Sequence, residues 1–451
     1  MHPSQPTRLT LLAPVLDTDQ HQLRFGFVHS FADRPDEHYE EVLALPATIW
    51  DEQILHSAAA ERLFVQLSLA LSLSYWKMYC PSEVLPYTAL TSVEANHWNT
   101  IYRDALGEFL FRNKIDPGVR VPFVGTAQQR SATRSSVRDL AIVPFGGGKD
   151  SLLTLHLLQQ SGTPFEAFTL GSSTVQEQGL ARLELRAQTI KRTLDPDMIR
   201  KSKSGEAYNG HVSITLIYAL TAALTALLCD ARWVVFSNEW SASEATTEWN
   251  GLAINHQWSK SLEAERLIRD LVHSSISPDL TIFSLLRPLT EVGIVSRVAS
   301  ELRPVFGSFS SCNRNFMIAS DRPHRADAAF WCGTCPKCAF VGLMFAPFIG
   351  KQALIEMMGS NPLEQAELLP IYEELLGRSS HKPFECVGTI EETAACLKAL
   401  ASHPDFAHDV IVQTLSPLLP ATTPSLDMLT QPITEALHEL PPPFHALYDH
   451  R

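Results

Sequence analysis

The sequence lacks the features of several common functional classes. Its 451 residues include 36 Lys and Arg against 49 Asp and Glu, and the net charge is −13. We expect no nucleic-acid partner, because a general nucleic-acid binder usually presents a basic face. Residues 1–18 lack a charged segment followed by a long apolar run, so we expect no secretory signal and a cytoplasmic protein.

Apolar runs long enough to cross a membrane are also scarce. VSITLIYALTAALTALLC (212–229) reaches the length at which a span must be considered. It is rich in Ser and Thr, however, and a second apolar run, WVVF, follows closely. A helix buried against a sheet explains this pattern better, so we expect no membrane partner.

Cysteine is limited to eight residues, of which three crowd into WCGTCPKC. Without a secretory signal, such a cluster indicates metal binding or catalysis rather than disulfides. Cys332, Cys335 and Cys338 have a CxxCxxC spacing that lets several sulfurs face one tetrahedral ion, and Cys312 is available as a fourth ligand. We predict a structural Zn²⁺ site; the alternatives are a reduced buried turn or a cysteine that acts as acid or base.

The order of apolar segments predicts an α/β protein in three parts. Residues 9–45 resemble an antiparallel meander, and helical patterns follow at 53–79 and 94–112. After a polar segment at 125–139, strands and helices alternate, which predicts a doubly wound parallel sheet. We therefore expect an N-terminal α+β domain for substrate recognition (1–130), a central domain (131–350) and a helical C-terminal region (351–451). The central elements should be strands at 140–145, 165–170 and 233–237 and helices at 150–161, 177–194 and 212–229.

The segment FGGGKDS (145–151) lies between the first of these strands and its helix. Glycines at the carboxyl end of a parallel strand let a ligand approach the backbone, and the helix start adds its positive end. This context favours a phosphate cradle over a plain glycine-rich turn. It is not a Walker A loop, because Asp150 stands where Ser or Thr would follow the Lys, and it is not GxGxxG.

Polar residues elsewhere should meet the same sheet edge or line a binding loop. Asn238 and Glu239 follow the strand WVVFS, although Glu239 could instead cap the next helix. His211 lies in the first turn of the long apolar helix, where a structural role is the alternative. We also single out a dense polar segment and one later arginine as candidates for substrate contact: Asn255, His256, Lys260 and Arg314.

The glycine segment resembles the PP-loop of the ATP-pyrophosphatase superfamily, SGGxDS, which grips the β- and γ-phosphates of ATP. Four positions match: Gly147, Gly148, Asp150 and Ser151. Gly146 replaces the first Ser of the pattern, so one side-chain contact with phosphate is missing. Lys149 occupies the variable position and could add charge toward phosphate. The resemblance implies a PP-loop/HUP-like sheet with ATP bound at Gly146–Ser151, Asn238 and Glu239.

The succession FGGGKDS, NGHVS, SNEWSAS, NHQWSKS, SCNRNF and WCGTCPKC is similar to the ATP-dependent UDP-N-acetylmuramoyl-L-alanyl-L-glutamate epimerase family of bacteria. The likeness covers roughly residues 70–345. It implies that ATP and Mg²⁺ adenylate the terminal carboxylate of a nucleotide-sugar dipeptide, that L-Glu becomes D-Glu, and that AMP and pyrophosphate are released. Asp150, His211 and Glu239 are the catalytic candidates, with His256 and the cysteines as further possible bases; the oligomeric state stays open.

Two other readings compete with this one. Another PP-loop ligase, of the 7-cyano-7-deazaguanine-synthase or amidotransferase kind, would adenylate its substrate and then add nitrogen or sulfur; the cysteine cluster suits such chemistry. A non-catalytic ATP-binding protein is the other class, and the missing loop Ser favours it slightly. Release of pyrophosphate would distinguish either enzyme from the non-catalytic ATP-binding protein. AMP formed without a nitrogen or sulfur donor would distinguish the epimerase from the ligase.

Overall fold

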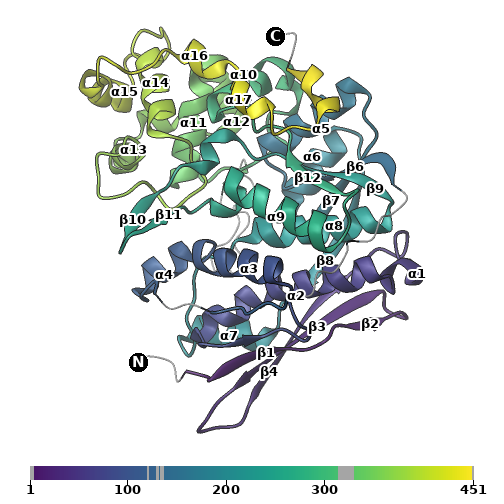
Figure 1. Cartoon of the computed structure of the whole chain (residues 1–451). Helices are drawn as coiled ribbons and strands as arrows, with labels where there is room; N and C mark the ends of the chain where they lie inside the picture. Colours follow the sequence, from purple (N-terminus) through teal and green to yellow (C-terminus); the bar gives the residue numbers. More distant parts are fainter. Residues whose placement is uncertain (1–4, 119–120, 128–131, 133–136, 313–329, 449–451) are drawn as a thin grey trace.

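The computed structural model describes residues 5–118, 121–127, 132, 137–312 and 330–448. Its frame is a ten-stranded sheet with the strand order β12-β9-β6-β7-β8-β4-β3-β1-β5, and β2 pairs with β3. The antiparallel N-terminal strands lie at the bottom of Figure 1, the parallel strands lie above them, and the C-terminal helices are at the top. The predicted α/β class with a large parallel sheet is confirmed.

The parallel half of the sheet carries the glycine segment. Each neighbouring pair in the order β12-β9-β6-β7-β8 runs parallel. The five strands are β6 (Arg138–Pro144), β7 (Phe165–Leu170), β8 (Ala187–Thr193), β9 (Ala231–Phe236) and β12 (Thr281–Ser284). Residues 140–144 of β6 are all buried, as expected for a strand covered on both faces.

Helices cover both faces of this half. Ile142 and Val234 point into one core with α8 (Ile214–Leu228) and α9 (Leu262–Ser275). Their neighbours Val143 and Val235 point into the other core, which is built with α5 (Lys149–Ser161), α10 (Glu291–Glu301) and α11 (Pro336–Ile349). Alternate residues of one strand thus serve opposite cores, which is the arrangement of a doubly wound sheet.

The N-terminal strands form the predicted antiparallel meander: β1 (Arg8–Leu11), β2 (Val15–Asp17), β3 (Gln22–Ser30) and β4 (Glu37–Ala44), with short β5 (Val84–Leu85) beside β1. Strand β4 also pairs antiparallel with β8. The buried Glu41 carboxylate accepts from Arg192 Nε at 2.5 Å across this junction. A single sheet therefore runs through both the predicted N-terminal domain (1–130) and the predicted central domain (131–350).

The predicted helix at 177–194 is wrong in its second half. Helix α6 (Thr174–Arg182) ends before Glu184, which has a positive φ of 58°, and β8 follows at Ala187–Thr193. The β-branched residues of AQTIKRT suit a strand, and pairing with both β7 and β4 supplies the hydrogen bonds. The helix expected at 94–112 is also interrupted, as α3 (Ser92–Asp104) and α4 (Gly107–Asn113).

The long apolar run folds as the buried helix α8. It packs between the sheet and α2 (Ala58–Tyr79), and its residues from Leu216 onward are buried except Tyr218. The hydroxyl of Thr225 donates to the Thr221 carbonyl oxygen at 3.1 Å, so a polar side chain is satisfied inside the core. Among the described helices, none is long and apolar enough to cross a membrane.

The remaining elements connect or cap this frame. A two-stranded hairpin of β10 (Thr247–Trp249) and β11 (Leu252–Ile254) stands apart from the main sheet. The C-terminal region is helical, as predicted. The other helices are α1 (Glu52–Leu55), α7 (Pro196–Ser204), α12 (Lys351–Met358), α13 (Leu369–Leu375), α14 (Ile390–Leu400), α15 (Val410–Leu415), α16 (Leu426–Thr430) and α17 (Thr434–Leu437).

Candidate functional site

The candidate site lies where the winding of the parallel sheet reverses. From β6 the chain passes through α5 to β7, whereas β9 lies on the other side of β6. In open α/β sheets, ligands bind beside the carboxyl ends of the strands at such a reversal. The glycine segment follows β6, Asn238 and Glu239 follow β9, and Glu291 comes after β12 on the way into α10. All three strand ends share one edge.

Residues Gly146–Gly148, here called the glycine corner, form the turn between β6 and α5. Gly147 has a φ of 82°, and a Cβ there would lie 2.9 Å from Val175 Cγ1 and 3.2 Å from the Gln176 nitrogen. Glycine is therefore required at this position. Gly146 is exposed, and a Cβ there would meet no atom within 4 Å. Space does not explain why the Ser of the PP-loop pattern is missing.

The corner presents backbone donors. Within the described part of the chain, the N–H groups of Gly147, Gly148 and Lys149 have no hydrogen-bond partner, and Gly148 makes no side-chain cap for α5. The Ser151 hydroxyl is occupied, since it donates to the Gly148 carbonyl oxygen at 3.1 Å. Free N–H groups at the start of a 13-residue helix are the chemistry that holds a phosphate.

Lys149 does not extend into solvent but is fully buried behind the corner. Its Nζ contacts carboxylate oxygens of both Asp150 and Glu291. Burial by itself would lower the pKa of Lys149, but the charges of Asp150, Glu291 and Glu239 outweigh it and raise that pKa. The lysine therefore stays protonated beneath the glycine corner, paired with Asp150 and Glu291 and within the influence of Glu239.

Glu239 is 3% exposed, and its side chain makes no cap bond although it precedes the short helix at Trp240–Ser243. Burial, and then the charge of Glu291, raise its pKa to about 7. The fully buried Arg287 holds this segment: Nη1 donates to the Glu239 carbonyl oxygen at 2.5 Å and Nη2 to that of Lys260 at 2.8 Å. The observed geometry does not support the capping interpretation of Glu239.

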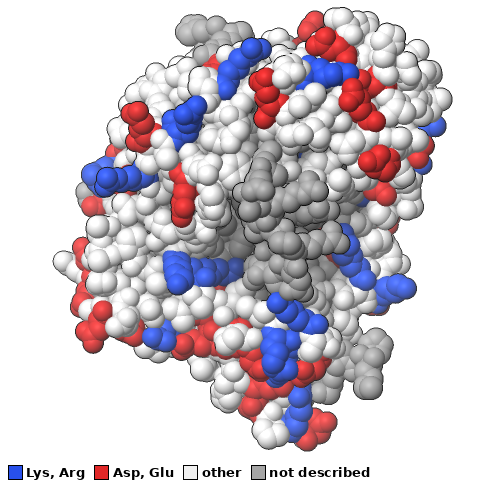
Figure 2. All heavy atoms as spheres, turned by 180° about the vertical axis from the view of Figure 1, so that it is seen from behind, with Lys and Arg blue, Asp and Glu red and all other residues white. Residues whose placement is uncertain are grey.

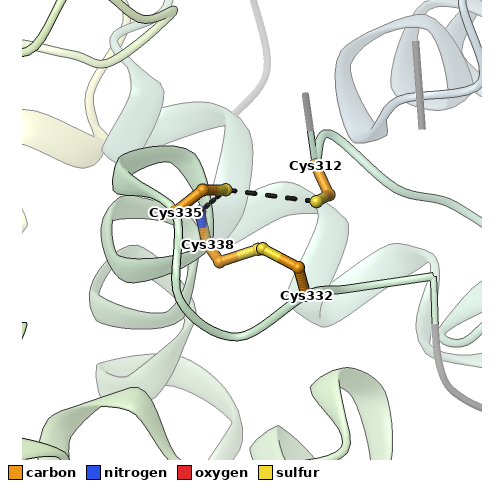
Figure 3. Close-up of side chains that lie close together, drawn as sticks. All are labelled: Cys312, Cys332, Cys335 and Cys338. Atoms are coloured by element: carbon orange, nitrogen blue, oxygen red, sulfur yellow. Dashed lines mark hydrogen bonds between the residues drawn. The ribbon is translucent and has the colours of Figure 1, made fainter. Parts of the chain in front are cut away.

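The structure brings the four predicted cysteines together, here called the cysteine cluster: Cys312, Cys332, Cys335 and Cys338 (Figure 3). Cys312 Sγ lies 4.0 Å from Cys335 Sγ, and Cys332 Sγ lies 3.7 Å from Cys338 Sγ. Four thiolates around a tetrahedral zinc would be about 3.8 Å apart, given Zn–S bonds near 2.3 Å. The donor set and its spacing fit such an ion, and binding itself stays a prediction.

The cysteine cluster also supports the glycine corner. Two residues before Cys312, the Ser310 nitrogen donates to the Gly147 carbonyl oxygen at 3.2 Å. Ser311 Oγ would lie 3.3 Å from a Cβ at Gly148. On the other side, Lys337 Nζ lies 3.5 Å from Glu291 Oε1. Residues next to the cysteines therefore contact both parts of the site: Ser310 contacts the glycine corner, and Lys337 contacts the carboxylate of Glu291.

A second group of ionisable side chains, here called the Cys386 cluster, comprises Glu108, His211, His256 and Cys386. His256 Nδ1 lies 2.5 Å from Glu108 Oε2, and His211 Nδ1 lies 3.7 Å from the same oxygen. The two imidazole rings are 4.6 Å apart. Glu108 and His256 are therefore hydrogen-bonded to each other and do not have the spacing of metal ligands, because two ligand atoms on a tetrahedral zinc would be about 3.3 Å apart.

The other predicted contact residues have different outcomes. Lys260 Nζ lies 3.4 Å from Cys386 Sγ, which places it in this second cluster. Asn255 holds its own loop, because Nδ2 donates to Ala242 and Oδ1 accepts from Gln257. It also lines a cavity of about 790 Å³ between α3 and the β10–β11 hairpin. Arg314 lies outside the described residues.

Several residues of the site escaped the sequence reasoning. Glu291 was detectable in principle, since it follows a third buried strand, TIFS, at the same edge. Glu108 sits in an unremarkable helix, and Cys386 is one isolated cysteine in a loop. Arg287 and Lys337 are single basic residues in apolar or cysteine-rich segments. Only their packing in the fold relates them to the glycine corner.

Charged residues on one face of the molecule are mixed in sign. On the face drawn in Figure 2, Lys and Arg side chains alternate with Asp and Glu over the described atoms. A mixed surface does not generate a strong field of one sign. Inside the molecule, the buried charged residues Lys149, Glu239 and Glu291 lie together, and the buried Glu108 belongs to the Cys386 cluster.

Two family models match this chain in sequence. The MurL N-terminal domain matches residues 2–285 and the MurL C-terminal domain matches residues 308–429. A UDP-N-acetyl-alpha-D-muramoyl-L-alanyl-L-glutamate epimerase of Xanthomonas oryzae pv. oryzae is 34% identical over 421 residues, or 92% of this chain and 91% of the relative. Proteins of the same name from a Micromonospora strain and from Salinispora tropica are 33% and 32% identical, covering 91% and 86% of this chain and 90% and 83% of those relatives.

Proposed function

This chain belongs to the MurL family, and on that premise we propose that it converts the terminal L-Glu of UDP-N-acetylmuramoyl-L-alanyl-L-glutamate to D-Glu. We propose further that the reaction consumes ATP and passes through an adenylated carboxylate. The names of the relatives support the substrate and the epimerisation. The glycine corner supports the use of ATP.

The ATP proposal rests on one observation: at the reversal point of the sheet, the N–H groups of Gly147, Gly148 and Lys149 have no hydrogen-bond partner among the described residues. Phosphates bind where backbone donors and a helix start converge. Lys149 Nζ is paired with the carboxylates of Asp150 and Glu291, so the attraction for phosphate would come from the backbone donors and the helix start. Asn238 and Glu239, which follow β9 at the same sheet edge, would then lie beside the bound nucleotide.

Adenylation solves a definite chemical problem. Removing the α-proton next to an ionised carboxylate would place two negative charges on neighbouring atoms. When the substrate carboxylate attacks the α-phosphate and pyrophosphate leaves, the first charge is lost and the α-carbon becomes far more acidic. A base then takes the proton, a proton returns on the opposite face, and water releases AMP. The protein must position ATP, exclude premature water and supply the base.

Metal ions would have two separate places. Mg²⁺, when bound, would supply the positive charge that the polyphosphate requires, and we propose that the carboxylates of Asp150 and Glu239 would hold it. We assign the cysteine cluster to a structural Zn²⁺. Its contacts with Gly147 and Glu291 through neighbouring residues support a role in shaping the site rather than in the chemistry.

The test uses the purified full chain with UDP-N-acetylmuramoyl-L-alanyl-L-glutamate, ATP and Mg²⁺. We expect D-Glu in the product, with AMP and pyrophosphate released in equal amounts. Unchanged L-Glu together with intact ATP would refute the proposal. D-Glu formed at full rate without ATP would refute the adenylation step while leaving the epimerase assignment in place.

The same assay separates the alternatives. AMP that appears only after ammonia or a sulfur donor is added would indicate a ligase. ATP bound in calorimetry but never hydrolysed, with or without the substrate, would indicate a non-catalytic binding protein. Asp150→Ala should abolish pyrophosphate release, because it removes the partly exposed carboxylate next to the glycine corner; full activity would show that the corner is only a turn.

A further inference from the structure

The epimerisation needs a base, and a cysteine that two lysines contact, Cys386, lies close to the proposed ATP site. Cys386 is in the loop before α14 and is partly exposed. Lys260 Nζ lies 3.4 Å from its sulfur. Lys337 Nζ donates to its carbonyl oxygen and lies 3.5 Å from Glu291 Oε1. One lysine side chain therefore spans from the carboxylates around Lys149 to Cys386.

Two further ionisable side chains, His256 and Glu108, lie near the Cys386 thiol. The Cys386 thiol also interacts with His256, whose Nδ1 lies 2.5 Å from Glu108 Oε2. Glu108 is 5% exposed and comes from α4, far away in the sequence. A reactive side chain next to a histidine that hydrogen-bonds an orienting carboxylate is typical of an activated nucleophile or base.

The surroundings of Cys386 favour the thiolate. Burial alone would raise its pKa, but Lys260, His256 and Lys337 lower it to about 5. For His256, the hydrogen bonds with Cys386 and Glu108 overcome burial and raise the pKa to about 9. Glu385 is the nearby acidic group, and burial raises its pKa to about 7. At neutral pH the pair is therefore a thiolate and an imidazolium.

The other cysteines outside the cysteine cluster differ from Cys386. Cys80, Cys229 and Cys396 are all buried, and burial raises the pKa of each thiol. They pack as small apolar side chains. Among the described cysteines, only Cys386 is partly exposed with one lysine on its sulfur, a second lysine on its carbonyl oxygen and a histidine beside it.

The loop that carries Cys386 is fixed in place. Gln257 Nε2 donates to the Val387 carbonyl oxygen at 3.0 Å, while its buried Oε1 has no partner within the described part of the chain. Lys382 Nζ donates to the Gly388 carbonyl oxygen at 3.2 Å. The polar segment at 255–260 and a lysine of the same loop therefore hold the backbone that carries Cys386.

We propose that the Cys386 thiolate is the base that removes the α-proton of the adenylated glutamate, with His256 and Glu108 holding it in position. This inference rests on the proposed function. The Cα–H bond breaks, an S–H bond forms, and the electron pair of the broken bond moves onto the carbonyl oxygen of the acyl adenylate as an enolate. A solvent-derived proton then adds to the opposite face of the α-carbon.

The decisive experiment separates adenylation from proton transfer. Full-length wild type, Cys386→Ala and Cys386→Ser are incubated with the UDP-linked dipeptide, ATP and Mg²⁺ in D₂O. We expect both variants to release pyrophosphate within a few-fold of the wild-type rate, while deuterium entry at the glutamate α-carbon falls at least about 100-fold. Deuterium entry near the wild-type rate in either variant would overturn the proposal.

Two further outcomes would also overturn it. If a variant with wild-type thermal stability lost pyrophosphate release as well, Cys386 would act in adenylation. If acid-quenched wild type carried the dipeptide on Cys386 in a bond that hydroxylamine cleaves, the thiol would be a nucleophile that forms a thioester. A wild type that released no pyrophosphate at all would instead refute the proposed function, which keeps the two failures distinct.

Glu108 is assigned as a positioning residue, and its test is a pH profile. Glu108→Gln removes the negative charge that keeps His256 protonated, so less imidazolium faces the thiol. The thiol pKa then rises, and the acid limb of the deuterium-exchange profile should move to higher pH. A rate reduced equally at all pH values would show only a structural role and would overturn this assignment.

Discussion

The glycine corner and the Cys386 cluster are built in opposite ways. The corner consists of consecutive residues between one strand and one helix, and its donors are backbone N–H groups. The Cys386 cluster takes its members from α4, the segment before α8, the turn after β11 and the loop before α14. A backbone site depends on local conformation, whereas a side-chain site depends on the packing of distant elements. The two should therefore fail in different ways when they are mutated.

The largest expected effect is at the corner. Gly147→Val places a branched side chain where a Cβ would lie 2.9 Å from Val175 Cγ1 and where φ is 82°. The loop must shift, and a displacement of about 1 Å is enough to reduce pyrophosphate release more than about 100-fold. Gly146→Ala is the matched control, because its Cβ meets nothing within 4 Å. Equal activity in both variants would contradict a backbone cradle.

The next effect tests how far the corner depends on the cysteine cluster. Cys335→Ser should abolish the proposed Zn²⁺ binding, lower the melting temperature and weaken ATP binding about 30-fold, because the segment that contacts Gly147 loses its anchor. Metal analysis, thermal denaturation and calorimetry measure these changes. Cys396→Ser, which alters a buried thiol outside the cluster, should keep the metal content. Unchanged ATP affinity in metal-free Cys335→Ser would separate the two regions.

A smaller effect probes the Cys386 cluster directly. At pH 6.5 a thiol with a pKa of about 5 is ionised, whereas an ordinary thiol is only about 1% thiolate. We expect iodoacetamide to modify Cys386 about tenfold faster than free cysteine, as followed by peptide mass spectrometry. Lys260→Met should slow this labelling, because it removes the cation nearest the sulfur. Labelling of Cys80 or Cys229 before Cys386 would contradict the assigned thiolate.

The smallest effect concerns Glu239. Its pKa is raised to about 7 in the folded chain, from an ordinary value of 4.5. Between those values the folded state keeps a proton that the unfolded state has released, so this carboxyl lowers stability as pH rises through that window. Glu239→Gln should therefore be more stable than wild type at pH 8, by about 1 kcal/mol, and nearly equal at pH 4. Urea unfolding at the two pH values measures this.

The exposed Glu248→Gln on β10 is the control for that prediction and should change stability little at either pH. If Glu239→Gln were equally stabilising at both pH values, its effect would not come from the buried charge. The fold would then hold the buried carboxylate of Glu239 after β9 without the loss of stability that burial of its charge is expected to cause.

The sequence pattern was most informative where one segment determines its own conformation. The strand at 140–145, its glycine turn and its helix were predicted nearly to the residue, because a fully apolar strand and three glycines leave few alternatives. The helix expected at 177–194 failed because residues 187–193 fill a gap between β7 and β4. No local pattern reports that a neighbouring strand needs a partner.

The same distinction applies to the site residues. Spacing alone brought Cys332, Cys335 and Cys338 together, and the fold supplied Cys312 beside them. His211 and His256 were singled out as polar residues near the ligand edge, but their shared partner Glu108 was not. Lys149 looked like a phosphate ligand in the sequence, yet the structure buries it against Asp150 and Glu291.

The amino-acid order by itself determined the glycine corner and the cysteine spacing, because both depend on backbone freedom and short separations along the chain. The tertiary structure alone decided that Glu108, His256, Lys260 and Cys386 would meet. Their charges matter only at contact distance and out of water, and no separation along the chain encodes that approach.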